Sequence, residues 1–531
     1  MDLSTIGIDA NFGLVDWCIV AGYLIIIVAV GVYIKRYISN VTDFIVAGRG
    51  LKTFLAIATM IGTELGLVTV MYSAQKGFTG GFAAFHIALA AAIVTLIVGL
   101  TGFIVVPLRR MKVMTIPEFY ERRFGRGVRI LGGTVLAFSG ILNMGMFLKA
   151  GTIFVMGITG MTSEIELKLI MTALLAMVLL YTVLGGMVSV VVSDYIQFVL
   201  LSFSLLAMCM LSIKHLGWHN IIETVSQLKG EAGFNPFHSE GFGISYVVWM
   251  FFLGLVSCAV WQTAVIRACS VESIQTVKKL YTWSSIGFLI RFLLPYFLGI
   301  SAFVYISQNQ PLKNLFLPEG ADADPQLTLM AMPVFLSQIL PVGLLGFVTA
   351  GMLAAFMSTH DSYLLCWSSV LTQDVVAPCF KKGLSSKARL LLTRIFIVAI
   401  GIFILVWGLW YPLGQDLWDY MAISGAIYFT GALALLAFGL YWKRASKVGA
   451  YLALIAGFCA IIGLKPVQIL LFRLASALGL ETAKIQAYIN GMPGARLSAI
   501  IGLSVISSAI VLMVAGSLIF PDRGPSVKHK E

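Results

Sequence analysis

The stretch AAFMSTHDSYLL, residues 354–365, places five consecutive polar residues in the middle of an apolar segment. On a helix, Ser358 shares a face with Asp361 and Ser362, and Thr359 shares one with Ser362. Hydroxyl and carboxylate oxygens are the ligands that hard cations prefer. Alternatively, the hydroxyls bond the preceding helical turn, as Ser and Thr commonly do in membrane helices. Five polar residues in a row, with an acid among them, favour a cation site.

The segments around this stretch indicate the class of protein. Of the 531 residues, 59% are hydrophobic and only 11% are charged, whereas soluble domains carry about 25% charged residues. Apolar runs of roughly 20 residues recur along the chain, each long enough to cross a bilayer as a helix. We therefore predict an all-α polytopic membrane protein with about thirteen transmembrane helices. The spans are expected near 15–34, 53–75, 82–107, 129–158, 167–184, 189–212, 244–265, 280–304, 341–370, 390–408, 417–441, 447–463 and 497–519.

Basic residues are distributed unevenly between the two sides of these spans. With the N-terminus outside, the inside segments hold 25 of the 36 Lys and Arg residues and the outside segments hold 9. By the positive-inside rule, this predicts an outside N-terminus and a cytoplasmic C-terminus in a cell membrane. The net charge of +12 then reports topology and contact with anionic lipids, and we expect no nucleic-acid partner.

Several classes of chemistry have no signal in the chain. No Walker or kinase motif occurs, so the sequence offers no site for ATP hydrolysis. Transport would then draw on an ion gradient or on the gradient of the solute itself. The seven cysteines show no CxxC spacing, which argues against a disulfide framework or a structural metal site. We expect no enzyme activity and no cofactor.

Two predicted spans carry small and polar residues near their centres. Residues 62–66 read GTELG in one, and the span at 244–265 contains Gly254, Ser257 and Gln262. Interrupted helices at membrane depth are tolerated where they line a cavity or are buried in protein. Two of them five spans apart predict two inverted five-helix repeats with a site between them. The alternative is that glycine-rich spans simply pack closely.

Four stretches carry a resemblance to a known family. They are AAFMSTHDSYLL, GGMVSVVVSDYIQFVLL at 185–201, TIPEFYERRFG at 115–125 and LYWKRASKVGA at 440–450. Together they resemble, in order, core segments of the sodium/solute symporter family, which includes sodium–glucose, proline, pantothenate and sialic acid transporters. The resemblance implies the leucine-transporter fold. It divides the single transporter domain, 1–531, into an extra N-terminal helix (1–52), a first core repeat (53–212), a second core repeat (244–441), and two C-terminal helices with a tail (442–531).

The resemblance also implies the ligands of a sodium ion. The principal sodium site falls on the backbone of Gly62, Leu65 and Ala355 and on the hydroxyls of Ser358 and Thr359.

A second cation position, present in some members of the family, falls on Asp194, Asp361 and Ser362. Two carboxylates at close range repel each other, so a sodium ion or a proton between them would relieve the repulsion. The alternative is that each acid pairs separately with a cytoplasmic Lys or Arg.

Substrate-binding candidates follow from the resemblance and from charges within spans. Asn143 and Arg291 match positions that bind sugar in the sodium–galactose symporter, while Ser257 stands where that protein has a gating tyrosine. Glu64 either adds negative field beside the sodium site or pairs with Lys149. Two basic residues near one cavity suit a carboxylate.

These observations lead to a functional hypothesis with alternatives. We expect a secondary active transporter that couples inward sodium flux to uptake of a small organic solute, with a carboxylate as the favoured chemistry. The alternatives are a symporter for a neutral solute such as a sugar and a transporter-like sensor or signalling body; a channel fits poorly. Its expected partners are sodium, the solute and membrane lipids, and the sequence indicates no oligomeric state.

Overall fold

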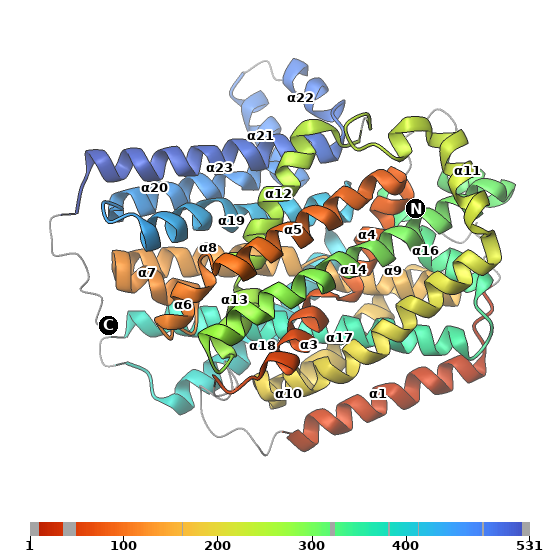
Figure 1. Ribbon diagram of the computed structural model, residues 1–531, viewed down its shortest axis with the longest axis horizontal. Coiled ribbons are helices and arrows are strands. Elements are labelled where there is room, and N and C mark those ends of the chain that lie inside the picture. Colours follow the sequence, from red (N-terminus) through yellow and green to blue (C-terminus); the bar gives the residue numbers. More distant parts are fainter. Residues whose placement is uncertain are drawn as a thin grey trace.

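The computed structural model describes residues 10–34, 49–161, 163–239, 241–318, 324–380, 383–411, 414–479 and 483–522. This part of the chain is helical throughout, and its one β feature is an isolated bridge between Leu51 and Val271. Figure 1 shows the helices as a bundle in which most axes run across the view.

The first half of the chain contains helices of very different lengths. A capping box begins the longest of them, because the Ser163 hydroxyl accepts the Glu166 N–H while the Glu166 carboxylate accepts the Ser163 N–H. The helices are α1 (Leu14–Ile34), α3 (Thr53–Glu64), α4 (Leu67–Gly80), α5 (Phe85–Thr101), α6 (Val105–Arg110), α7 (Ile116–Phe124), α8 (Arg126–Met144), α9 (Phe147–Thr159), α10 (Glu164–Leu216) and α11 (Trp218–Lys229).

The second half begins with another interrupted helix and ends with a long apolar one. Its helices are α12 (Gly243–Ala259), α13 (Gln262–Ser270), α14 (Ile274–Gln308), α15 (Gln310–Phe316), α16 (Pro325–Ile339), α17 (Leu344–Val370), α18 (Ser386–Trp410), α19 (Leu417–Tyr441), α20 (Lys447–Phe458), α21 (Lys465–Ala477), α22 (Ala483–Asn490) and α23 (Gly494–Ile519).

Both spans with polar centres are broken in the structure. The first separates into α3 and α4 at Leu65–Gly66. The second separates into α12 and α13 at Val260–Trp261, with a bend of 41°. This second break lies between Ser257 and Gln262, two of the polar residues that predicted it.

The predicted spans all fall on helices, with one difference in how they are divided. The spans expected at 167–184 and 189–212 lie on one continuous helix, α10, of 53 residues. The sequence between them, residues 185–188, reads GGMV, and each glycine in a helix costs only about 1 kcal/mol, which is too little to end a helix that is otherwise apolar.

Fewer helices qualify as membrane spans by length and apolarity alone than the thirteen expected from the sequence. Among the described residues, seven qualify, or nine when each of two bent pairs counts as one span. Helix α17 is not one of them, since its centre carries the polar residues 358–362.

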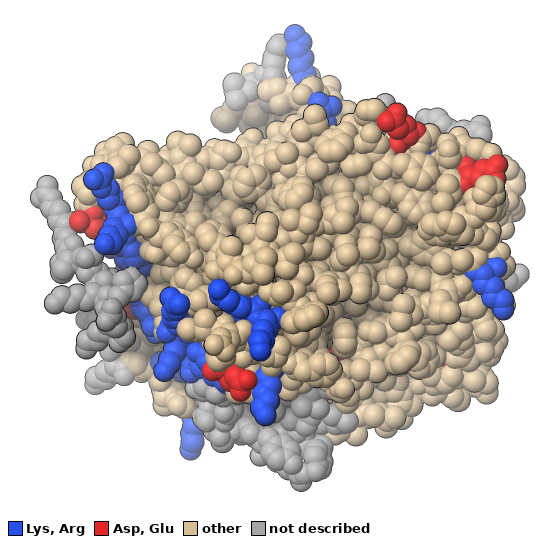
Figure 2. Space-filling model, in the orientation of Figure 1, with Lys and Arg blue, Asp and Glu red and all other residues tan. Residues whose placement is uncertain are grey.

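Charged side chains mark one end of the bundle. Figure 2 shows Lys and Arg side chains gathered at the lower left of the molecule, over the ends of α6, α7 and α13, with a broad uncharged surface beside them. An uncharged surface with basic residues at one end is what the positive-inside rule predicts for a membrane protein. The sidedness of the two termini stays a prediction.

The helices that carry the polar stretch pack together. Helix α17 contacts α10, α3 and α4, while α14 packs along α4 and α5. In Figure 1, α3, α10 and α17 lie in the lower half of the view, and α1 runs along α10 and α17. The break between α3 and α4 therefore faces α17.

Candidate functional site

The break between α3 and α4 is held against α17 by a glycine. A Cβ added at Gly66 would lie 1.9 Å from the Thr359 hydroxyl oxygen and 2.8 Å from the Thr359 Cβ. Only glycine allows the backbone at the break to lie so close to the Thr359 side chain. At the preceding residue, Leu65, the backbone leaves the helix with φ −93° and ψ 62°, which frees carbonyl groups near the break.

Hydroxyl and carbonyl oxygens converge at this contact. The Ser358 Oγ lies 3.3 Å from the Gly62 carbonyl oxygen. The Thr359 Oγ1 lies 3.2 Å from the Thr63 carbonyl oxygen and 3.1 Å from the carbonyl of Ala355 in its own helix. Four of the five residues expected around sodium thus contribute oxygens to one cluster, and Leu65 lies at the break beside them. Neutral oxygens of this kind are suited to a hard monovalent cation.

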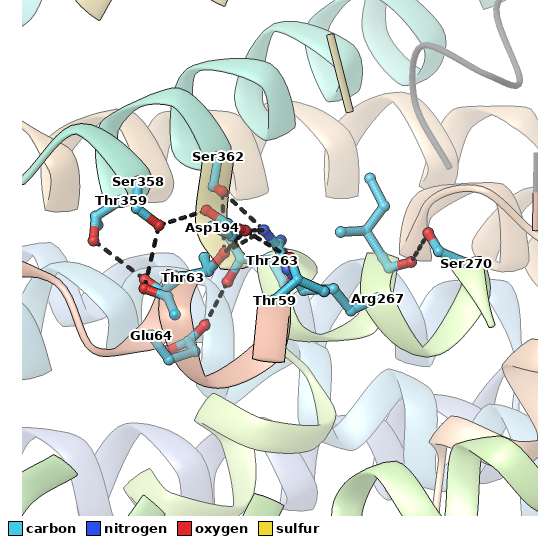
Figure 3. Close-up of polar contacts among 12 residues, drawn as sticks. Thr59, Thr63, Glu64, Asp194, Thr263, Arg267, Ser270, Ser358, Thr359 and Ser362 are labelled. Carbon is cyan, nitrogen blue, oxygen red and sulfur yellow. Dashed lines mark hydrogen bonds and ion pairs between the residues drawn. The ribbon is translucent and has the colours of Figure 1, made fainter. Parts of the chain in front are cut away.

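Asp194 of α10 lies behind this cluster and is fully buried. Three hydroxyls donate hydrogen bonds to its carboxylate: Ser358 at 2.5 Å, Thr59 at 2.6 Å and Thr63 at 3.0 Å. Figure 3 shows these side chains directed towards Asp194 from α3 and α17. The carboxylate therefore adds negative charge close to Ser358, one of the expected sodium ligands.

A guanidinium group completes the cluster. Arg267 of α13 is 1% exposed, and its Nη2 lies 3.6 Å from the Asp194 Oδ2. The same nitrogen donates to the Ser362 Oγ at 2.8 Å and to the Thr63 hydroxyl. Asp194 and Ser362, two of the residues expected around a second cation, are thus joined through an arginine. The third, Asp361, is fully buried on α17.

Arg267 belongs to residues 267–279, one of the inside segments in the count of basic residues, but the structure buries it in α13. The residue lies in the second half of the broken helix, at the end of WQTAVIR. The sequence gave only a weak signal that Arg267 is buried. It lies one helical turn after Thr263 and directly before a small residue, Ala268. Thr59 and Thr63 were likewise not singled out as partners of Asp194.

A cavity of about 100 Å³ lies next to this oxygen cluster. Thr63 and Thr359 belong both to its wall and to the oxygen cluster described above. Much of the wall is aromatic: it includes Tyr72, Phe147, Trp261, Phe292, Trp418 and Phe429. A small apolar chamber with a few polar groups is the usual form of a small-molecule site.

An ion pair supplies the charged groups of this cavity. The Arg291 Nη1 lies 3.1 Å from the Glu64 Oε2 and also donates to the Glu64 carbonyl oxygen at 3.1 Å. The other carboxylate oxygen of Glu64 accepts the Thr263 hydroxyl at 3.0 Å. The guanidinium carbon lies 4.0 Å and 4.4 Å from the ring centres of Phe288 and Phe292. The cavity is therefore polarised without carrying a net charge from this pair.

The alternative that Glu64 pairs with Lys149 is wrong. Lys149 is buried, but its Nζ donates to the carbonyl of Tyr411 at 2.8 Å, and Lys149 does not belong to the cavity wall. Hydropathy placed both charges in spans, but it carries no information about which charges meet.

The remaining substrate candidates do line the cavity. Asn143 reaches it from α8, and its amide nitrogen donates to the Met421 carbonyl and the Ser424 hydroxyl, both at 3.0 Å. Ser257 reaches it from α12, and its hydroxyl bonds back to the Gly254 carbonyl at 3.0 Å. Glu64, Asn143, Ser257 and Arg291 are thus brought together, and Lys149 is not.

A second buried charge cluster lies at the far end of α4. Lys76 is 3% exposed, and its Nζ lies 2.7 Å from Asp416 Oδ2 and 2.9 Å from Asp419 Oδ2. The Tyr246 hydroxyl donates to the other oxygen of Asp419 at 3.4 Å. This cluster connects α4 to α12 and α19 and was not anticipated from the sequence.

Known proteins resemble the chain in sequence over most of its length. It is 27% identical to the human sodium/myo-inositol cotransporter over 497 residues, covering 83% of this chain and 66%, just under two thirds, of that protein. It is 25% identical to sodium/proline symporter 2 of Staphylococcus saprophyticus, covering 83% and 84% of the two chains. It is 24% identical to a sodium/sialic acid symporter of Proteus mirabilis, covering 85% and 90%.

Solved structures show the same fold. A sodium-coupled sialic acid symporter in a substrate-bound, outward-open state superimposes with a TM-score of 0.76 at 19% identity, covering 96% of this chain and 100% of the other. The structure of MhsT in complex with L-phenylalanine gives a TM-score of 0.53 at 14% identity, covering 88% of this chain and 99% of the other. The expected all-helical fold of the leucine-transporter type is confirmed. The model of the "Sodium:solute symporter family" matches residues 44–457, and the chain belongs to this family.

Proposed function

We propose that this chain is a secondary active transporter that couples inward sodium flux to the uptake of a small organic solute. The observation that carries the proposal is the contact between the hydroxyls of Ser358 and Thr359 and the carbonyls of Gly62 and Thr63 at the helix break. Neutral oxygens from two helices, close to a buried carboxylate, form a site that takes a cation only when the helices are together.

Coupling follows from the position of this contact. Thr63 and Thr359 contribute to the oxygen cluster and also line the solute cavity. A sodium ion held there stabilises the arrangement of α3 and α17 that forms one wall of the cavity. The ion thereby favours the conformation that binds solute, and the solute favours sodium binding by the same free energy.

The favoured solute class is a small molecule that carries a carboxylate. Arg291 lines the cavity and uses its Nη1 to bind Glu64, while no described residue accepts a hydrogen bond from its Nε. A guanidinium can bind a carboxylate through several N–H groups at once. The aromatic wall suits an apolar body on the same solute.

Uptake into proteoliposomes tests the function. The solute is first identified by a thermal-shift screen of amino acids, monocarboxylates, pantothenate, sialic acid and sugars, with and without sodium. We expect labelled solute to accumulate only with an inward sodium gradient, and Ser358→Ala to raise the sodium concentration required. Equal uptake when choline replaces sodium would refute the coupling. A sugar as the sole substrate would refute the carboxylate and leave the coupling intact.

A further inference from the structure

We propose that two buried glutamines, Gln75 and Gln262, are positioning residues that hold opposite ends of the solute cavity closed. Gln75 closes the end at α16 and Gln262 closes the end at α7, and Figure 1 shows these two helices at opposite ends of the bundle. The inference rests on the proposed function, because a transporter of this kind opens its cavity to one side at a time. It concerns residues that lie outside the oxygen cluster and outside the cavity wall.

Gln262 is the first residue of α13 and is fully buried. Its Oε1 accepts the Ile116 N–H at 2.9 Å, and its Nε2 donates to the Met114 carbonyl at 3.3 Å. Because Ile116 begins α7, the side chain satisfies a backbone N–H that the helix start leaves without a partner in its own helix. The preceding residue, Trp261, lines the cavity and donates to the Tyr363 hydroxyl of α17. One amide therefore connects the cavity wall to the start of α7.

Gln75 makes equivalent contacts at the other end of the cavity. It lies on α4, is 1% exposed, and its Nε2 donates to the Pro325 carbonyl at 2.8 Å and to the Thr328 hydroxyl at 2.9 Å, at the start of α16. Its Oε1 accepts the N–H of Leu417, the first residue of α19, at 3.0 Å. The next residue, Trp418, lines the cavity. This amide therefore connects the cavity wall to the start of α16.

The two sets of contacts are reciprocal between the predicted repeats. Each glutamine lies in the half of a broken span that follows the break, α4 or α13. Gln75 of the first predicted repeat binds α16 of the second, while Gln262 of the second binds α7 of the first. Inverted repeats place equivalent elements on opposite sides of the membrane, and transport rocks one repeat against the other. Opening one end of the cavity therefore separates one glutamine from its partners and leaves the other bonded.

Other contacts near each glutamine keep the helices together when its hydrogen bonds are removed. Lys76 pairs with Asp416 at 2.7 Å beside Gln75, and the Thr115 hydroxyl donates to the Asp374 Oδ1 at 2.9 Å between Met114 and Ile116. The backbone groups that a Gln→Leu substitution leaves unpaired in the closed state regain water when that end opens. We therefore expect such a substitution to shift the balance between closed and open ends without unfolding the chain.

Sided labelling of a cysteine in the cavity tests the proposal. The reporter is Ala422→Cys, in the cavity wall, in a chain whose seven natural cysteines are replaced by alanine. A membrane-impermeant methanethiosulfonate is applied to right-side-out and to inside-out vesicles. With 109–129 inside and 305–340 outside, as the sequence predicts, Gln262→Leu should raise the inside-to-outside ratio of labelling rates at least about fivefold. Gln75→Leu should lower the ratio at least about fivefold.

A third buried glutamine provides the control. Gln468 is 8% exposed, and its side-chain amide donates to the Gly463 carbonyl five residues earlier. Gln468→Leu removes this local bond and should leave the ratio within about twofold of wild type. Thr328→Val removes one partner of Gln75 without touching the glutamine, and should lower the ratio about two- to tenfold.

The outcomes separate this inference from the function on which it rests. A ratio that moves in the same direction in both glutamine variants, or in neither, would overturn the inference, because a merely structural role would raise labelling from both sides alike. If the glutamine variants do not fold, an unchanged ratio in Thr328→Val overturns it. The measurement needs neither sodium nor solute, so sodium-independent uptake would refute the proposed function without deciding the role of the glutamines.

Discussion

Replacing Thr359 by valine exchanges one hydroxyl for one methyl group at the helix break. The Thr359 Oγ1 lies 3.2 Å from the Thr63 carbonyl, across the contact between α17 and α3. A hydrogen bond or ligand contact to a charged group contributes about 1.5–3 kcal/mol, and each 1.4 kcal/mol is tenfold in affinity. We therefore expect Thr359→Val to raise the sodium concentration for half-maximal effect roughly 10- to 150-fold.

A matched threonine on the same helix provides the control. Thr349 is 2% exposed, and its hydroxyl bonds to the Leu345 carbonyl of its own helix at 2.8 Å, so Thr349→Val removes a hydroxyl away from the break. The assay is the rise in melting temperature with sodium, with choline chloride holding ionic strength constant. The reasoning fails if Thr359→Val stays within twofold of wild type, or if Thr349→Val shifts the sodium response equally.

Three further changes test the cavity and the packing around it. Arg291→Gln should weaken binding of a carboxylate solute by about 1.5–3 kcal/mol. Its control, Lys149→Gln, removes a bond to a carbonyl outside the cavity and should leave solute affinity within about twofold of wild type. Calorimetric titration compares the two variants, and equal losses of affinity would contradict the assignment of Arg291 to the solute site. Lys76→Met leaves two acids without their cation and should destabilise the fold by about 3–5 kcal/mol, seen as a lower melting temperature; an unchanged value would show that the cluster adds nothing. Gly66→Ala forces a methyl onto Thr359 and should abolish the sodium-dependent stabilisation, while Gly22→Ala, whose added methyl meets no atom within 4 Å, should retain it.

The local pattern of apolar and polar residues was sufficient to predict the helices and the residues around the helix break. Apolar runs marked the helices because burial in lipid or protein requires apolar side chains at nearly every position of a span. The polar residues 358–362 and the glycines at 62 and 66 were visible for the same reason, since they interrupt that pattern. The end of a helix was less visible: we predicted a boundary between the spans 167–184 and 189–212, and α10 continues through it.

Partners of buried charges were beyond the reach of local pattern. Glu64 was recognised as a charge within a span, but its partner, Arg291, lies 227 residues away and comes from α14. Lys149 was expected at the cavity and instead binds the carbonyl of Tyr411. Hydropathy and helical period predict which residues are neighbours on one helix. Ion pairs between helices depend on which helices pack together and on how far along its helix each residue lies.

Taken by itself, the sequence determined that the chain is a bundle of apolar helices, two of them broken, with Ser358 and Thr359 on a buried helical face. The tertiary structure decided what those groups meet: the carbonyls of α3, the carboxylate of Asp194 and the guanidinium of Arg267. The sequence placed Arg267 in an inside segment, 267–279, because a charge near the end of a predicted span is normally solvated. Arg267 is buried only because α13 packs against α3, α10 and α17. A charge can be buried where an opposite charge and hydroxyl groups bind it.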